Sequence, residues 1–209
     1  MLVFPDSNKL KEITEAYKAH IRFAAHLRCS VVGTETGIPN TDNSFTEEAR
    51  SAKNLSEFIK NLTPVVRYAE SMGVLFAIEP VWKHTVYSPE RARAVLDNIG
   101  SPNLRIIFDP VNLIDPRHPS ERDDIIDRTI ELLGKDIAVI HLKDYLMENG
   151  EMKCMACGLG EMDYTKVIRF AEERKPFIQA TLENTKPDNA EAARKYVEEI
   201  ASRYSYMGK

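Results

Sequence analysis

Four short apolar runs along the chain each end in an acidic or imidazole side chain, and this feature constrains the fold most. The runs are Val74–Glu79, Leu104–Asp109, Ile137–His141 and Phe177–Glu183. Helix-period segments separate them, and such alternation is typical of parallel strands joined by crossover helices. In barrels and open parallel sheets alike, the carboxyl ends of the strands face the ligand. We therefore expect the four terminal side chains to converge on one pocket.

The segments between the runs carry helix start and stop signals. Asp6 or Ser7 is suited to cap a helix that extends to Leu27, and Gly73 is suited to end a helix over residues 47–72. Ser88 followed by Pro89 predicts another helix start. Further helices are expected near residues 120–133, 164–173 and 189–203, and one more buried strand over residues 29–33. The pattern predicts an α/β fold with about five βα units.

Size and charge limit the function classes that need consideration. A chain of 209 residues can bury one substantial core, so residues 1–209 are expected to form a single domain. The formal net charge of -4 argues against a broad basic face for nucleic acid. The N-terminus has no signal-peptide pattern and no run reaches membrane-spanning length. We therefore expect a cytoplasmic protein with no nucleic-acid or membrane partner.

Three carboxylates and one imidazole at successive strand ends favour a divalent metal ion. Hard oxygen donors with one nitrogen suit Mn²⁺, Mg²⁺ or Co²⁺, and they are also compatible with Zn²⁺. Any one acid at a strand end is more often a helix cap or half of an ion pair. Four such residues at successive strand ends favour the interpretation as metal ligands. Buried charges need compensation, and one shared cation supplies it.

Several local strings resemble the xylose isomerase-like TIM barrels, a family that includes sugar and sugar-phosphate isomerases and epimerases and the endonuclease IV type of repair enzyme. The strings are Ala77–Pro80, Phe108–Asn112, His141–Asp144, Gly158–Gly160 and Leu182–Asn184. The resemblance covers nearly the whole chain and implies a (β/α)8 barrel. It also implies that the metal ligands are Glu79, Asp109, His141 and Glu183, with Glu79 and Glu183 acting as the catalytic proton-transfer groups.

The implied reaction is proton transfer next to a carbonyl through a metal-stabilised enediolate. Return of the proton to the opposite face gives an epimerase, and its return to the neighbouring carbon gives an isomerase. The expected substrate is a small sugar or sugar phosphate. The candidate substrate-binding residues are His84, Asn112, Lys143 and Glu35.

The barrel is expected to be incomplete at the N-terminus. A complete barrel has eight strands, whereas the sequence shows about five, and its first helix resembles the third helix of the family. Uncovered strand edges beside an apolar interior favour association with another copy. We therefore expect a homo-oligomer.

Two alternatives stay open at this point. The chain is also compatible with a non-catalytic relative that kept the fold and serves as a binding or interaction module. A DNA-repair phosphodiesterase of the endonuclease IV type fits less well, because the chain is acidic and holds only five histidines.

Overall fold

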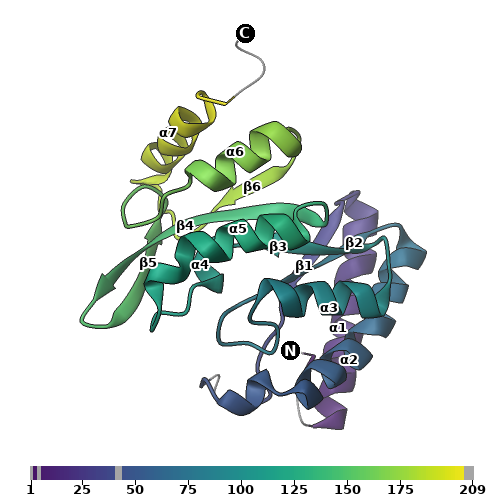
Figure 1. Cartoon of the computed structure of the whole chain (residues 1–209). Coiled ribbons are helices and arrows are strands. Elements are labelled where there is room, and N and C mark those ends of the chain that lie inside the picture. The colour runs from purple at the N-terminus through teal and green to yellow at the C-terminus, as the bar shows by residue number, and fades with distance from the viewer. Residues whose placement is uncertain (1, 4–5, 41–43, 205–209) are drawn as a thin grey trace. The chain divides into compact units, whose positions relative to one another are not determined.

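The computed structural model describes residues 2–3, 6–40 and 44–204 (Figure 1). These residues divide into two compact units. Unit 1 comprises Met1–Ile107 and Lys135–Ile137, and unit 2 comprises Phe108–Gly134 and Ala138–Lys209. The prediction of a single domain over residues 1–209 stays a prediction, and each unit is described by itself.

Unit 1 contains parallel strands covered by helices. Strand β1 (Val31–Glu35) pairs with β2 (Leu75–Glu79), and β2 pairs with β3 (Leu104–Phe108), both in parallel. The helices are α1 (Ser7–Leu27), α2 (Ala52–Met72) and α3 (Pro89–Ile99), with the 3₁₀ helix η1 (Glu47–Arg50) before α2. Strand β2 is buried from Phe76 onward, since both of its neighbours and the helices cover it.

The helix signals of unit 1 act as predicted. The Asp6 carboxylate accepts hydrogen bonds from the first turn of α1, and the Ser88 hydroxyl accepts one from the backbone of Arg91 in α3. Gly73 ends α2 in the left-handed conformation, which costs a glycine little. The helix predicted over residues 47–72 is interrupted at Ser51, whose extended backbone separates η1 from α2 and whose hydroxyl caps α2.

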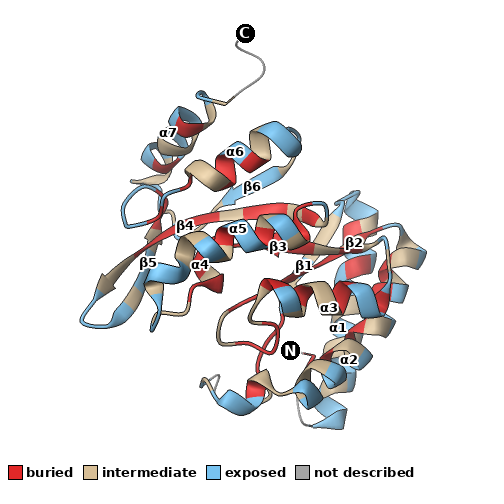
Figure 2. Ribbon diagram, in the orientation of Figure 1, coloured by how far each residue is buried: buried red, intermediate tan, exposed pale blue. Residues whose placement is uncertain are grey.

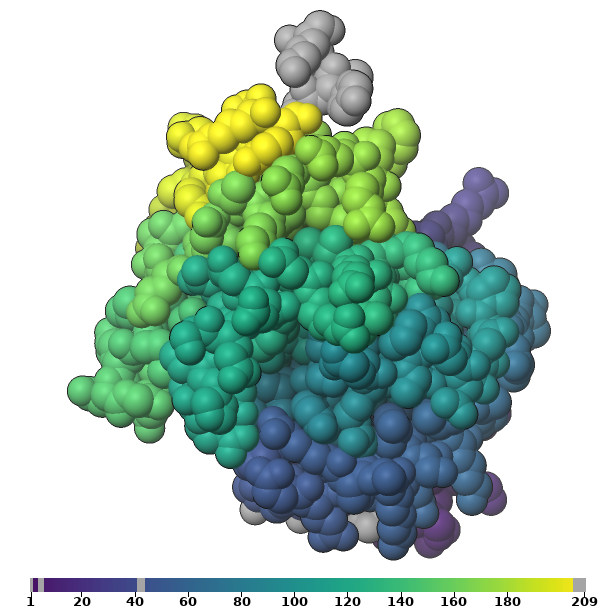
Figure 3. All heavy atoms as spheres, in the orientation of Figure 1, coloured from purple at the N-terminus to yellow at the C-terminus, as the bar shows by residue number. Residues whose placement is uncertain are grey.

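Unit 2 is built around β4 (Ile137–Glu148), which belongs to it from Ala138 onward. Strand β6 (Gln179–Leu182) pairs with β4 in parallel, and β5 (Glu151–Ala156) pairs with it antiparallel. The helices are α4 (Pro110–Leu113), α5 (Arg122–Leu133), α6 (Thr165–Arg174) and α7 (Ala190–Ala201), with the 3₁₀ helix η2 (Pro119–Glu121) before α5. Helices α6 and α7 pack against each other, and Figure 3 shows their side chains in direct contact.

The predicted α/β fold with five βα-type strands is confirmed in β1, β2, β3, β4 and β6. The limits of β1 differ from the prediction, because the strand covers Val31–Glu35 and thus ends at Glu35 instead of Gly33. The apolar run was expected to end at His141, but the chain continues from it into a hairpin. There β4 continues to Glu148, and a turn with Asn149 and Gly150 at positive φ leads into β5. Its partly exposed residues lack the apolar run that marked the other strands.

Strands β1 and β6 differ from β2 and β3 in their exposure. Figure 2 shows β2 and β3 largely buried, whereas most residues of β6 are exposed and those of β1 are exposed or half-buried. Phe177, just before β6, is 96% exposed. Among the described helices, none has the length and apolar character that crossing a membrane requires.

Candidate metal centre

In unit 2, the parallel pairing of β4 with β6 brings two of the predicted ligands together. His141 lies opposite Thr181, and the Glu183 N–H donates to the carbonyl oxygen of Leu142. Side chains two residues apart on a strand share a face. His141 and Lys143 therefore lie on one face of β4, beside Glu183, which directly follows β6.

The side chains on this face form a compact charged cluster. Glu183 Oε1 lies 3.0 Å from His141 Nδ1, and Glu183 Oε2 lies 3.1 Å from Lys143 Nζ. Lys143 Nζ also lies 2.7 Å from Asp109 Oδ2. One ligand atom of Asp109 lies within 4.8 Å of one of His141. We call Asp109, His141, Lys143 and Glu183 the charged cluster.

Asp109 serves the local backbone as well as the charged cluster. It directly follows β3 and is the N-cap residue of α4, where its Oδ1 accepts a hydrogen bond of 3.0 Å from the backbone N–H of Asn112. Its other oxygen faces Lys143. The helix-cap role and the cluster role thus coexist in one buried carboxylate. Asn112 contributes its backbone N–H to this cap, and its predicted role in substrate binding stays a prediction.

The backbone of Lys143 is fixed by Tyr164, which is fully buried. The Tyr164 hydroxyl accepts a hydrogen bond from the Lys143 N–H and donates one to the Lys143 carbonyl oxygen. Tyr164 directly precedes α6. The helix start therefore holds the strand segment from which the lysine side chain extends.

Electrostatics in the charged cluster favour the ionised forms. The hydrogen bond with His141 lowers the pKa of Glu183 to about 2, with Lys143 adding to the effect against the opposing effect of burial. Burial by itself would lower the pKa of Lys143, but Asp109 and then Glu183 raise it above its ordinary value. Glu183 is therefore a carboxylate and Lys143 an ammonium at neutral pH.

In unit 1, two strands end side by side on carboxylates. Glu35 at the end of β1 lies in register with Glu79 at the end of β2. Glu79 is buried, whereas the Glu35 side chain is 55% exposed. This position for Glu79, at a buried strand end, agrees with the predicted strand limits.

His84 lies in the loop after β2, close to Glu35. Its Nδ1 accepts a hydrogen bond of 3.1 Å from the Gly37 N–H, and its Nε2 lies 3.6 Å from Glu35 Oε2. Burial, with a smaller contribution from Lys83, lowers the pKa of His84 to about 4. The ring is therefore neutral at pH 7 with its hydrogen on Nε2, the nitrogen that faces Glu35.

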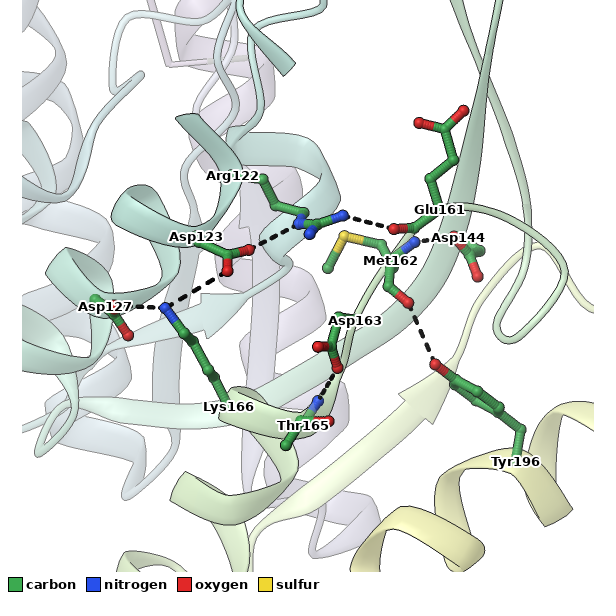
Figure 4. A network of polar contacts seen from close by, with 10 residues as sticks. All are labelled: Arg122, Asp123, Asp127, Asp144, Glu161, Met162, Asp163, Thr165, Lys166 and Tyr196. Atoms are coloured by element: carbon green, nitrogen blue, oxygen red, sulfur yellow. Dashed lines mark hydrogen bonds and ion pairs between the residues drawn. The ribbon is translucent and has the colours of Figure 1, made fainter. Parts of the chain in front are cut away.

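The Gly158–Gly160 string belongs to a connection that Asp144 holds in place. The fully buried Asp144 carboxylate accepts backbone hydrogen bonds from Tyr145, Gly158 and Met162, at 2.8, 3.0 and 2.8 Å. Figure 4 shows the bond from Met162, together with Arg122 of α5 reaching the Glu161 carbonyl oxygen. A Cβ at Gly160 would lie 2.1 Å from the Tyr145 carbonyl oxygen. This close approach explains why glycine occupies the position.

The donor set fits a divalent cation. Within unit 2, Asp109 and His141 form a candidate set of metal ligands, and a carboxylate oxygen with an imidazole nitrogen suits Mg²⁺, Mn²⁺ or Zn²⁺. Glu183 lies outside this set but contacts His141 directly. Sequence reasoning did not find Tyr164, since a lone tyrosine before a helix carries no signal of the backbone that it fixes.

Comparisons with known proteins agree with this architecture. Residues 2–203 match the model of a family described as xylose isomerase-like TIM barrel. A comparison with curated proteins found no match.

Solved structures share the fold at low sequence identity. A D-tagatose 3-epimerase-like protein has a TM-score of 0.74 and 18% identity, with 95% of this chain and 72% of that chain covered. The IOLI protein with a bound zinc atom has a TM-score of 0.74 and 19% identity, with 98% and 76% covered. A xylose isomerase-like TIM barrel protein from Mycobacterium smegmatis, in complex with magnesium, has a TM-score of 0.71 and 14% identity, with 96% and 70% covered.

Proposed function

Because the chain belongs to the xylose isomerase-like TIM barrel family, we propose that it works as a metal-dependent sugar or sugar-phosphate isomerase or epimerase. The observation that carries the proposal is the charged cluster. Asp109 directly follows β3, His141 lies within β4, and Glu183 directly follows β6. Their side chains lie within ion-pair distance of one another or of a shared lysine. Clusters of buried charges are costly to build, and they occur preferentially at functional sites.

The proposed metal ligands are Glu79, Asp109, His141 and Glu183. A divalent cation bound there supplies stabilisation of the negative charge that develops on a substrate carbonyl oxygen. Mn²⁺, Mg²⁺ and Co²⁺ are the preferred candidates, and Zn²⁺ is also compatible. Solved relatives with zinc and with magnesium support a divalent ion without choosing among them.

Glu79 and Glu183 are the proposed proton-transfer groups. A carboxylate must be ionised to accept a proton from the carbon next to the carbonyl, and Glu183 is ionised at neutral pH. The other carboxylate returns the proton to the substrate. Delivery to the opposite face of the same carbon inverts it, and delivery to the neighbouring carbon moves the carbonyl.

Four further residues are proposed to contact the substrate. The Nε2–H of neutral His84 and the Glu35 carboxylate are a donor and an acceptor suited to sugar hydroxyl groups. Lys143 Nζ contacts Asp109 Oδ2, and the Asn112 N–H donates to Asp109 Oδ1. These contacts support the proposal that both residues meet a substrate near Asp109.

The proposal is tested by metal analysis together with a proton-exchange screen. We expect the purified protein, supplied with Mn²⁺, to exchange a substrate C–H proton with solvent deuterium for at least one ketose or ketose phosphate in a broad panel. Glu183→Gln should lower the exchange rate by at least about 10²-fold, the lower range for a general acid–base group. Glu191→Gln, an exposed glutamate on α7, is the matched control and should exchange like the wild type.

Two outcomes would count against the proposal. Metal binding with no exchange across the whole panel would favour a non-catalytic binding module. Equal exchange by Glu183→Gln and the wild type would remove Glu183 from the reaction.

A further inference from the structure

Lys143 is a buried cation held between two of the proposed metal ligands. Its Nζ lies 2.7 Å from Asp109 Oδ2 and 3.1 Å from Glu183 Oε2, and the lysine side chain is 7% exposed. The Asp109 side chain is fully buried. The ammonium therefore already neutralises part of the negative charge that a divalent cation would use.

The lysine is fixed in this position by the backbone on both sides. The pairing of β4 with β6 sets Lys143 beside Glu183, and the Tyr164 hydroxyl holds both backbone polar groups of Lys143. The α4 cap fixes Asp109 through its Oδ1, which leaves Oδ2 directed at the ammonium. The three charged groups are thus placed by secondary structure, so their contact does not depend on a freely moving side chain.

We propose that the Lys143 ammonium competes with the divalent cation for Asp109 and Glu183, so that Lys143 weakens metal binding by this chain. An ammonium 2.7 Å from a ligand oxygen occupies one of its hydrogen-bonding directions and repels a second positive charge. The inference rests on the proposed function, since it takes Asp109 and Glu183 to be ligands. Lys143 is in this view a counter-ion that sets metal affinity.

Calorimetric titration with Mn²⁺ tests the competition. Lys143→Gln removes the charge but keeps a hydrogen-bond donor, and we expect it to bind Mn²⁺ at least about tenfold more tightly than the wild type, the change that 1.4 kcal/mol produces. Lys143→Arg keeps the charge and should bind no more tightly than the wild type. Lys153→Met, which removes an exposed lysine of β5, is the matched control and should stay within about twofold.

The outcomes separate this inference from the proposed function. If the wild type binds Mn²⁺ and folded Lys143→Gln binds it equally or less tightly, the proposed competition is overturned. The proposed metal site is not affected by that result. No Mn²⁺ binding by any variant overturns both.

Circular dichroism establishes folding before titration, and Lys143→Met serves as a second uncharged variant if Lys143→Gln does not fold. If both uncharged variants fail to fold, a measurement on the wild type replaces them. The rate at which the Lys143 amine is acetylated is then measured by mass spectrometry, with and without Mn²⁺. If the cation displaces the ammonium from its carboxylates, Lys143 reacts faster when Mn²⁺ is present. An unchanged rate overturns the proposed competition.

Discussion

Single side chains in this protein serve the fold and the candidate site together. Asp109 caps α4 with one oxygen and contacts Lys143 with the other. Tyr164 begins the segment into α6 and fixes the backbone of Lys143. Substitutions at such positions change stability and ligand binding at once, so tests of function need variants whose folding is measured in parallel.

The pH dependence of stability should report on His84. Its pKa falls from 6.5 to about 4 on folding, because burial disfavours the charged ring. Between these two pH values the unfolded chain binds a proton that the folded chain does not, so the contribution of His84 to stability is lost as the pH falls through the window. Up to about 3 kcal/mol is at stake, at about 1.4 kcal/mol for each pKa unit.

Urea unfolding at pH 7 and pH 4.5 measures this effect. His84→Asn should lose less free energy of unfolding on acidification than the wild type loses. His20→Asn, at an exposed site on α1, should behave like the wild type. Equal losses in all three proteins would show that His84 is not buried as a neutral ring.

At the scale of elements, the connection from β4 to α6 depends on Asp144. Its carboxylate accepts hydrogen bonds from three backbone N–H groups, and the bonds from Tyr145 and Met162 are buried. The Gly158–Gly160 string lies in this connection, and the hydrogen bond from the Gly158 N–H to Asp144 anchors it to β4. These contacts tie the segment to β4, although Leu159 within it is 56% exposed.

Asp144→Asn should therefore destabilise the protein. The amide keeps one acceptor oxygen but turns an N–H₂ group toward backbone donors, and a buried donor left unsatisfied costs about 1 to 3 kcal/mol. Asp163→Asn is the matched control, since the Asp163 carboxylate accepts from Thr165 at an exposed site, and its cost should stay below about 1 kcal/mol. Urea unfolding measures both, and equal midpoints would contradict the role of Asp144.

The sequence predicted most elements because their signals are local. Asp6, Ser88 and Gly73 act at helix ends as expected, and the apolar runs that end at Glu79 and Asp109 mark buried strands. The hairpin of β4 and β5 was not predicted, because its residues are partly exposed and carry no apolar run. The position of Lys143 between two acids could not be predicted from local sequence patterns either, since it depends on strand register and on Tyr164.

At the scale of the whole molecule, the described residues provide five βα-type strands, whereas the complete barrel of this fold has eight. It covers 72%, 76% and 70% of the three solved relatives named above. Within the described part of the chain, β6 pairs with β4 alone and is mostly exposed. An exposed strand edge presents backbone N–H and C=O groups that can pair with another chain.

We propose that a second copy of the chain covers β6. Phe177, an apolar ring 96% exposed just before the strand, would be buried by such a partner. Light scattering at rising concentration should show a mass above that of the monomer, and Phe177→Asp should lower it. Leu27→Asp, at an exposed apolar site on α1, should leave the mass unchanged. A monomeric wild type at high concentration would contradict the proposal.

The two contacts of Asp109, the α4 cap and the ion pair with Lys143, affect how sequences of relatives can be interpreted. Since one oxygen caps α4, replacement of this aspartate would destabilise the fold even in a relative without catalytic activity. The presence of this aspartate in a relative is thus weak support for catalytic activity. Glu183 caps no helix in the described structure, and its carboxylate is committed to His141 and Lys143. Under the proposed function, replacement of Glu183 in a relative would therefore indicate a lack of activity more clearly than the presence of Asp109 indicates activity.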